Sequence, residues 1–322
     1  MLQSDHTGPD LVICGAARAG TSYLASLLGS HPEIDPGSVK EPNFFSRELA
    51  RGPGWYDKLF QPRDRGLFRL DASVSYTFGH FPHALENLAG HAPNAVMVYS
   101  VREPLRRLLS HFQLHRAYFQ NETAVTLGEA LRSSPVYLGA SDYARWLDML
   151  YRLFGDDRVV VVPLDAVAAR TTEVLDLICE RLGIDSQEID VNTNTSAQHR
   201  NEVVEFRHEA LRRIRRFARR RGAYPWIRRT VGADRLRRLR VRATRPAPVE
   251  SLVEALGTCD DGQLRSLEEL YSSAQRAVAT ALAAQDSRTG LSWYTLWADT
   301  CPPTGSLALR ALERSRLRRE DR

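Results

Sequence analysis

A buried strand followed by a glycine loop and an apolar helix is the sequence feature that constrains this chain most. The apolar run "DLVIC" ends at Cys14, and the loop "GAARAG" follows it from Gly15 to Gly20. Apolar residues then recur at helical spacing up to Gly29, a residue type that commonly ends helices. The first N–H groups of such a helix lack intrahelical partners and favour a bound phosphate. The segment therefore predicts an α/β protein with a phosphate site after its first strand.

Two further apolar runs, at 95–101 and 158–163, predict buried strands of the same sheet. Pro104 suits the first turn of a helix that reaches about His115, and a helix over about 172–182 ends at Gly183. A long helix is predicted at about 262–284. This alternation predicts a single α/β domain with a P-loop-type parallel β-sheet flanked by helices, and ligands at the carboxyl ends of the strands.

The composition predicts a cytoplasmic protein without structural disulfides. The polar start "MLQSDHTGPD" lacks the apolar core of a secretory signal, and no window approaches 18 consecutive apolar residues. The four cysteines are too few and too scattered for a disulfide framework or a zinc site. Among 44 basic residues only Lys40 and Lys58 are lysines, so a single arginine indicates function more weakly than a single lysine does.

A strongly basic segment at 205–247 interrupts the alternating pattern. Between Arg207 and Arg245 the many arginines are opposed only by Glu209 and Asp234. The segment is predicted to be helical, and it is either a solvated surface, a lid over an anionic substrate or a nucleic-acid surface. It lacks the regular aromatic residues of single-strand binding surfaces, so nucleic acid is the less favoured partner. The tail at 302–322 is also basic and is predicted to be disordered.

The glycine loop departs from the loop of nucleotide triphosphatases. That loop reads G-x-x-x-x-G-K-[ST], with the lysine on the β- and γ-phosphates and the hydroxyl on magnesium. Here Thr21 stands at the lysine position, and Arg18 supplies a positive charge inside the loop. No strand end offers an obvious acidic ligand for magnesium. Taken alone, the glycine spacing is equally compatible with a structural turn.

Two segments together resemble the donor site of sulfotransferases that use 3′-phosphoadenosine 5′-phosphosulfate (PAPS). "GAARAGTSYL" resembles their 5′-phosphosulfate-binding loop, and "REPLRRLLS" resembles their 3′-phosphate-binding pattern R-x-P-x-x-R-x-x-S. The resemblance implies that Arg102 and Ser110 hold the 3′-phosphate and that no metal ion is needed. The loop residues implied to bind the donor are Gly15, Arg18, Ala19, Gly20, Thr21, Ser22 and Tyr23.

Two further segments resemble those of glycosaminoglycan sulfotransferases and their bacterial relatives. "KEPNFFS" is similar to their K-E-x-x-F-F segment, which implies that Glu41 is the general base and that Arg18 and Lys40 act on developing charge. "DASVSYTF" is similar to their E-K-[ST]-P-x-Y-F segment, although Ala72 replaces a lysine that these enzymes often carry. The predicted acceptor contacts are Ser73, Tyr76 and His80. The resemblance spans most of 11–297 and predicts a sulfotransferase domain over 1–301.

Several alternatives stay open at this point. The base could be a histidine, for which His80, His83 and His111 lie in suitable regions. The chain could instead be a P-loop phosphotransferase that uses ATP and magnesium, or a nucleic-acid-binding protein that uses 205–247. For a sulfotransferase, the predicted acceptor is a hydroxyl, less readily an amine, of a glycan, a lipid or a small molecule. The oligomeric state is not predicted.

Overall fold

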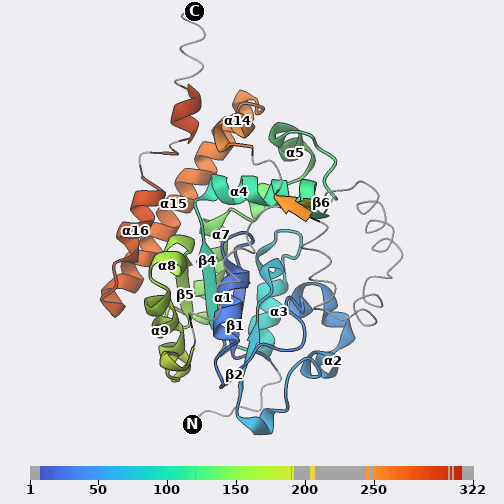
Figure 1. Cartoon of the computed structure of the whole chain (residues 1–322), viewed down its shortest axis with the longest axis vertical. Helices are drawn as coiled ribbons and strands as arrows, with labels where there is room; N and C mark the ends of the chain where they lie inside the picture. The colour runs from blue at the N-terminus through green and yellow to red at the C-terminus, as the bar shows by residue number, and fades with distance from the viewer. Residues whose placement is uncertain are drawn as a thin grey trace, which may run out of the picture.

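A five-stranded parallel sheet lies at the centre of the computed structural model, with strand order β2-β3-β1-β4-β5 (Figure 1). The structure describes residues 8–119, 121–189, 191, 204–206, 244–246, 250–303, 305–306 and 308–313. The strands of the sheet are β1 (Leu11–Gly15), β2 (Ile34–Asp35), β3 (Phe68–Asp71), β4 (Val96–Val101) and β5 (Val159–Pro163). Every residue of β1, β4 and β5 is buried, because helices cover both faces of the sheet.

The α-helices and the shorter helical turns follow these strands in chain order. The α-helices are α1 (Thr21–Leu28), α2 (Pro53–Asp57), α3 (Ala84–His91), α4 (Pro104–Gln113), α5 (Leu127–Ser133), α6 (Val136–Gly139), α7 (Tyr143–Phe154), α8 (Leu164–Ala169), α9 (Thr171–Leu182), α14 (Leu252–Leu256), α15 (Asp261–Thr289) and α16 (Trp293–Thr300). The turns are η1 (Phe44–Glu48), η2 (Leu49–Arg51), η3 (Arg63–Arg65), η4 (Val74–Thr77), η5 (Leu114–Phe119) and η6 (Ser186–Glu188).

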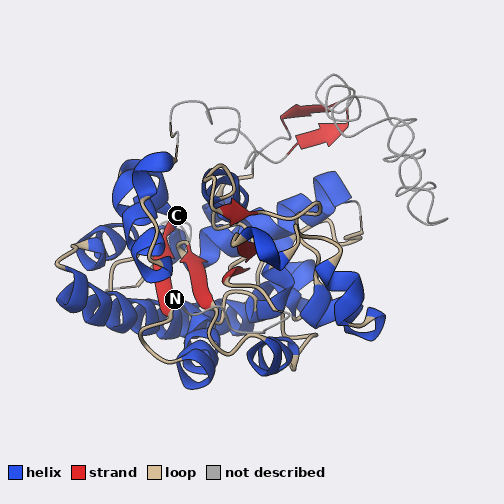
Figure 2. Cartoon of the chain, turned by 90° about the horizontal axis from the view of Figure 1, so that it is seen from below, coloured by secondary structure: helices blue, strands red, loops and turns tan. Residues whose placement is uncertain are grey.

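Helices cover both faces of the sheet, as the end-on view in Figure 2 also shows. Helix α7 packs between α3 and α15, and all three lie on the face opposite to α1 (Figure 1). Helix α9 packs on β4 and β5. From β1 the chain passes through α1 to β2 on one side of the sheet, and from β3 it passes through α3 back across β1 to β4 on the other side. Because crossovers between parallel strands are right-handed, helices on the outward and return paths lie on opposite faces. The predicted fold class, a parallel sheet flanked by helices, is confirmed.

Most predicted element boundaries are confirmed within two residues. Pro104 is the first residue of α4, and Glu103 caps that helix by accepting a hydrogen bond from the Arg106 N–H. Helix α9 ends at Gly183, whose φ of 74° is the left-handed conformation that glycine adopts readily. The long C-terminal helix extends five residues beyond its predicted end, to Thr289.

The C-terminal helices complete the core of the sheet. Gln285 of α15 donates to the Val161 carbonyl and accepts from the Val161 N–H, at 3.1 and 3.0 Å, and so pairs with the edge strand β5 as a further strand would. Trp293 and Trp297 of α16 are fully buried in the same core. Residues 250–300 are therefore part of the α/β body rather than an appendage.

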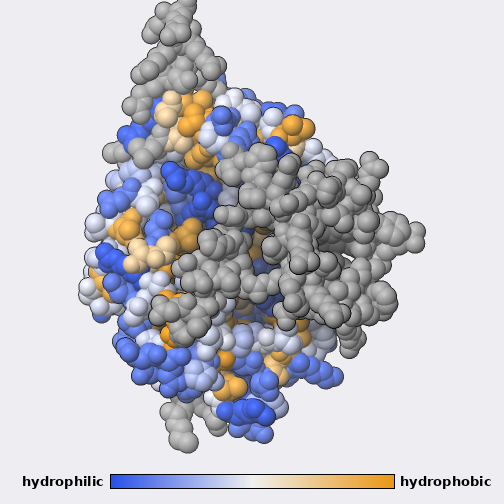
Figure 3. All heavy atoms as spheres, viewed as in Figure 1, coloured by the Kyte–Doolittle hydropathy of each residue, from blue (hydrophilic) through white to orange (hydrophobic). Residues whose placement is uncertain are grey.

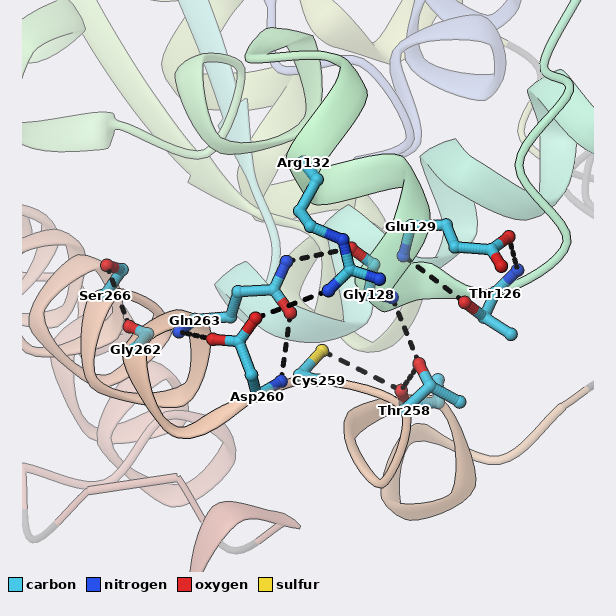
Figure 4. A network of polar contacts seen from close by, with 11 residues as sticks. Thr126, Gly128, Glu129, Arg132, Thr258, Cys259, Asp260, Gly262, Gln263 and Ser266 are labelled. Carbon is cyan, nitrogen blue, oxygen red and sulfur yellow. Dashed lines mark hydrogen bonds and ion pairs between the residues drawn. The ribbon is translucent and has the colours of Figure 1, made fainter.

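Figure 4 shows the contacts that join α5 to the start of α15. Thr126 and Asp260 each form a capping box with the third residue of their helix. Gln263 donates to the Gly128 carbonyl at 2.8 Å, and the Gly128 N–H donates to Thr258 Oγ1 at 3.0 Å. Each helix start is therefore fixed both by its own cap and by its neighbour.

Two predictions at the chain's basic segments differ from the structure. The described ends of the 205–247 segment are strands, since β6 (Val204–Phe206) and β7 (Thr244–Pro246) pair antiparallel. The predicted helices at 207–243 lie outside the described residues.

In the tail that was expected to be disordered, residues 308–313 are helical and bury Leu309 and Leu312. Apolar side chains at helical spacing in this tail pack against the body and so offset the cost of ordering it.

The described surface is mixed in character. Hydrophobic and hydrophilic residues alternate over the part of the face that Figure 3 colours, and Val125 and Tyr294 are the strongly exposed large hydrophobic residues of the described chain. No helix among the described residues has the length and apolarity that crossing a membrane requires.

Candidate active site

Three loops that follow neighbouring strands meet at one edge of the sheet. Strand β1 lies between β3 and β4, so the chain leaves Gly15, Asp71 and Val101 at adjacent positions. The strand order reverses at β1, and α/β proteins bind ligands at such a reversal. The segments at 15–22 and 102–110 that were predicted to bind phosphate follow two of these three strands.

A cavity of about 600 Å³ opens at this edge, within the usual size of small-molecule sites. Arg18, Glu41 and Asn43 line it, and they are the three non-glycine residues with positive φ in the described chain, at 72°, 61° and 55°. A strained backbone of this kind costs roughly 1–3 kcal/mol per residue and is often found at ligand sites. A second hollow, of about 490 Å³ between α7 and α15, is lined by none of the predicted site residues.

The glycine loop directs the N-terminus of α1 at the cavity. Gly20 has a φ of 84°, and a Cβ there would lie 2.5 Å from Leu164 Cδ1, so this position requires glycine. Thr21 and Ser22 open the helix and line the cavity. This end of α1 therefore offers hydroxyls, orphan N–H groups and a positive dipole to an anion.

Other predicted loop residues support the loop rather than line the cavity. Ala19 is fully buried and Tyr23 is 7% exposed. The Ala19 carbonyl accepts a hydrogen bond from Ser100 Oγ, which ties the loop to β4. A Cβ at Gly15 would lie 2.3 Å from Thr77 Oγ1, so Gly15 is needed for close packing against the neighbouring loop.

Three arginines gather beside the glycine loop. Arg18 Nε donates to Ser110 Oγ at 2.9 Å, Arg102 Nη1 donates to the Arg18 carbonyl at 3.5 Å, and Arg107 Nη1 donates to the Ala17 carbonyl at 3.3 Å. Burial, together with the charges of Arg102 and Arg107, lowers the pKa of Arg18 to about 10.

Two arginines of this cluster, Arg102 and Arg107, are not paired with carboxylates of the described chain. Burial lowers the pKa of both. Guanidinium groups that repel one another in a partly buried place favour a multiply charged anion there. The structure thus brings Arg18, Arg102 and Ser110 together, as the two predicted phosphate segments require.

Arg107 is fully buried and holds the walls of the cavity in place. Its Nε donates to Ser141 Oγ at 2.6 Å and its Nη2 to the Tyr137 carbonyl at 2.7 Å. Its Nη1 also donates to His111 Nδ1 at 3.2 Å, besides the contact with the glycine loop. A single side chain therefore connects the glycine loop, α4 and the segment around α6.

Glu41 lines the cavity from the segment before η1. Its Oε1 lies 3.3 Å from Lys40 Nζ, and the two side chains are 38% and 36% exposed. Asn43 Nδ2 donates to the Glu41 carbonyl at 2.6 Å, and the Asn43 N–H donates to Ser73 Oγ at 3.0 Å. Lys40 contacts Glu41 but does not line the cavity.

The predicted acceptor contacts Ser73 and Tyr76 are corrected by the structure. Both side chains are fully buried and donate to Asp71, Ser73 at 2.6 Å and Tyr76 at 2.7 Å, while Tyr56 donates at 2.8 Å. Burial raises the pKa of Asp71, and the three hydrogen bonds oppose that rise. These residues therefore hold the loop beneath Glu41 instead of reaching a ligand. Their neighbour Ser75 lines the cavity.

The three candidate histidines differ in position. His83 is exposed, bonds Glu86 and does not line the cavity. His80 lines it, and burial and the charge of Arg47 lower its pKa. His111 is 2% exposed, and its Nδ1 accepts from Arg107, which always donates, so its proton is on Nε2. Burial holds the pKa of His111 well below 6.5.

Several residues at or behind the cavity were not predicted from the sequence. Arg107 lies behind the lining residues. It is the second arginine of the pattern R-x-P-x-x-R-x-x-S, and it recurs with Pro104, Leu108 and His111 at the spacing of one helix face. Both signals could have separated it from its exposed neighbour Arg106. Asn43 and His115 had no comparable signal, because their places depend on how separate loops meet. Among the described residues, no three or more His, Cys, Asp or Glu side chains gather as metal ligands do.

Comparison with known proteins identifies relatives of one kind. The family model described as "Sulfotransferase domain" matches residues 8–239. Over 111 residues the chain is 33% identical to a bifunctional heparan sulfate N-deacetylase/N-sulfotransferase 1 of Caenorhabditis briggsae, which covers 33% of this chain and 12% of that protein. Over 105 residues it is 30% identical to heparan sulfate glucosamine 3-O-sulfotransferase 6 of Mus musculus, which covers 32% of this chain and 30% of that protein.

The chain therefore spans less than a third of the length of these curated relatives. Among solved structures, a sulfotransferase from Alicyclobacillus acidocaldarius aligns with 56% of this chain and 83% of its own, at 26% identity and a TM-score of 0.48.

Proposed function

Because the chain belongs to the sulfotransferase domain family, we propose that it transfers a sulfonyl group from PAPS to a hydroxyl, less readily an amine, of a glycan or another alcohol. The observation that carries this proposal is the cluster of Arg18, Arg102 and Arg107 at the N-terminus of α1. PAPS carries negative charge at both its 5′ and its 3′ ends, so one ligand can contact the whole cluster.

The residues present fit the two ends of this donor. Thr21, Ser22 and Arg18 line the cavity and would hold the 5′-phosphosulfate. Arg102 and Ser110 would hold the 3′-phosphate, because a guanidinium and a hydroxyl are both donors to phosphate oxygens. The hydrogen bond between Arg18 Nε and Ser110 Oγ supports this assignment, because it would make the two proposed subsites adjacent, as two phosphates on one ribose require.

Glu41 is the proposed general base. It accepts the proton of the acceptor hydroxyl while the acceptor oxygen forms a bond to sulfur and the bond from sulfur to the bridging phosphate oxygen breaks. Arg18 and the N-terminus of α1 stabilise the charge that develops on that bridging oxygen. Lys40 lies 3.3 Å from the Glu41 carboxylate and orients it. The products are the sulfate ester and 3′-phosphoadenosine 5′-phosphate (PAP).

The histidine alternatives are less favourable. His111 Nδ1 is occupied by Arg107, and His83 lies outside the cavity, so neither is placed to take a proton from an acceptor. His80 lines the cavity and remains the alternative base. Its side chain is largely exposed, whereas Glu41 is held by Lys40 and by the backbone contact with Asn43.

A transfer assay with two labelled donors tests the proposed function. The purified protein is incubated with acceptor extracts and either sulfur-labelled PAPS or γ-labelled ATP with magnesium. Label from PAPS should appear in a product together with PAP, and label from ATP should not be transferred. Transfer of phosphate from ATP, with no binding of PAP, would instead support the P-loop phosphotransferase that the sequence left open.

A further inference from the structure

The cavity has a second end whose chemistry differs from that of the arginine cluster. Five aromatic rings line it in a continuous row, which we call the ring wall: His80, Phe78, His111, His115 and Phe119. The centroids of successive rings lie 5.4, 5.7, 4.6 and 5.4 Å apart. Leu114 and Val136 add aliphatic surface beside the row. His80, Phe78 and His111 are tilted by 39° and 32° between neighbours, whereas His115 stands nearly perpendicular to its neighbours, at 85° and 89°. Rings of this kind offer apolar contact area with little conformational freedom to lose.

The ring wall carries little charge at neutral pH. Burial is the main cause that lowers the pKa of His80, His111 and His115, and neighbouring arginines lower it further, so the imidazoles are neutral. Among the described residues that line this end, Arg47 is the cation and its guanidinium lies over the Phe81 ring, 5.0 Å from the centroid. A chain of sulfated or carboxylated sugars would find few counter-charges here.

His111 supplies a polar group within the wall. Its Nδ1 accepts from Arg107, so Nε2 carries the proton. No residue of the described chain accepts a hydrogen bond from that Nε2, although the side chain is 2% exposed and lines the cavity. The Nε2 atom itself is not fully buried, so it opens on the cavity that this side chain lines and can donate to an oxygen of a bound ligand. The fully buried Arg107 is then the positioning residue that fixes the tautomer of His111.

We propose that the acceptor is an uncharged ring alcohol, which stacks on the ring wall and accepts a hydrogen bond from His111 Nε2. This inference rests on the proposed function and gives its acceptor a chemical class. The acceptors that meet these requirements share an uncharged ring with two oxygen substituents. One oxygen accepts the hydrogen bond from His111, and the other is the hydroxyl whose proton Glu41 takes. A phenol-like aryl ring and a neutral sugar ring both satisfy the stacking requirement, and a strongly anionic glycan does not.

Binding to the protein saturated with PAP tests the acceptor class directly. The probes are the aryl diol 2,7-dihydroxynaphthalene, the neutral sugar methyl β-D-glucopyranoside, and a heparosan octasaccharide as the polyanion. Calorimetry first measures PAP alone and then each probe with PAP present. Three variants are compared with the parent: His111→Phe, which keeps a ring but removes Nε2–H; His111→Gln, which keeps a donor; and His83→Phe, a matched change at an exposed histidine outside the cavity.

At least one uncharged probe should bind, and His111→Phe should weaken its binding up to about 10-fold, as the loss of one hydrogen bond implies. His111→Gln should recover part of that loss, His83→Phe should have no effect, and all variants should bind PAP as the parent does. A variant counts only if its melting transition remains cooperative.

Three results would overturn the inference. They are tighter binding of the octasaccharide than of both uncharged probes, binding of neither uncharged probe, and an uncharged probe whose affinity is unchanged in both His111 variants. In each of these cases intact PAP binding would leave the proposed function standing. Failure of the parent protein to bind PAP would contradict the proposed function itself, and the acceptor class with it.

Discussion

Glu41 is the residue on which the proposed chemistry depends. It lines the cavity with a φ of 61°, and its carboxylate lies 3.3 Å from Lys40 Nζ. Glu41→Gln preserves size and polarity but cannot accept a proton. We expect turnover to fall about 100-fold or more while PAP affinity stays near that of the parent. Initial rates and calorimetry measure the two quantities.

The control for this change is Glu33→Gln, at an exposed glutamate that does not line the cavity. It should leave turnover unchanged. If Glu41→Gln keeps most of the parent's turnover, Glu41 is a structural residue of its loop and His80 becomes the base to test.

Arg102 and Arg106 offer a matched pair at the proposed 3′-phosphate site. Arg102 is partly buried and contacts the glycine loop, whereas Arg106 points to solvent from the same turn of chain. Arg102→Ala removes a charge-assisted donor to phosphate and should weaken PAP binding by about 2 kcal/mol or more. Arg106→Ala should change it far less. Equal effects in calorimetry would show that Arg102 acts through general charge and not as a phosphate ligand.

At the scale of elements, Gly128 tests how closely α5 approaches the start of α15. A Cβ at this position would lie 2.2 Å from the Thr258 carbonyl oxygen. Alanine normally favours a helix over glycine by about 1 kcal/mol. Because of the clash, we expect Gly128→Ala to lower the free energy of unfolding instead, by roughly 1–3 kcal/mol. Denaturant unfolding measures the change.

Gly90→Ala is the control for that effect. Gly90 lies in α3, where a Cβ would meet no atom within 4 Å, so the same substitution should be neutral or stabilising. Stabilisation by both substitutions would mean that α5 and α15 separate readily in solution.

Glu103 gives the cap of α4 a pH dependence. Burial raises the pKa of its carboxyl to about 7 from 4.5, although the Arg106 N–H and nearby arginines oppose the rise. The folded state therefore binds more protons than the unfolded state between these two pH values, and this group's contribution to stability falls as pH rises through them. Glu103→Gln keeps an acceptor for the cap but does not titrate.

We therefore compare the free energy of unfolding of Glu103→Gln with that of the parent at each pH. The difference, variant minus parent, should be larger at pH 8 than at pH 5 by about 1–3 kcal/mol. Paired denaturation curves at the two pH values measure the difference, and other titrating groups cancel between the two proteins. A constant difference across this range would contradict the raised pKa.

At the scale of the whole molecule, the proposed donor site joins parts of the chain that are distant in sequence. Arg18 contacts Ser110 across 92 residues, and Arg107 contacts the segment around α6. A ligand that neutralises this cluster binds the folded state alone. We expect PAP at 100 times its dissociation constant to stabilise the protein by about 2.7 kcal/mol and to raise its melting temperature.

The shift in melting temperature should persist in the presence of a chelator, since the proposed donor contacts are arginines, hydroxyls and backbone N–H groups. ATP with magnesium is the comparison ligand. A shift with ATP and magnesium that exceeds the shift with PAP, and that the chelator abolishes, would count against the proposed donor.

Local sequence was sufficient to predict the parallel sheet and the glycine loop at 15–20. Parallel strands that are buried on both faces appear in the sequence as continuous apolar runs. A glycine with positive φ or a proline in a first helical turn can likewise be recognised from a few adjacent residues. The residues that the family model matches, 8–239, include this loop and the strands of the sheet. The helical boundaries of α4 and α9 were predictable for this reason.

Other features were decided only by the tertiary structure. Ser73 and Tyr76 carry a motif that resembles an acceptor site, yet they point into the protein, because Asp71 lies beneath them and needs their hydrogen bonds. The ring wall joins residues of the loop after β3 with residues of α4 and η5, and the position of Arg107 depends on carbonyl groups from two other segments. Side-chain direction at such places is set by contacts between segments 30 to 90 residues apart, such as those of Arg107 with Tyr137 and Ala17, and local propensity carries no information about those contacts.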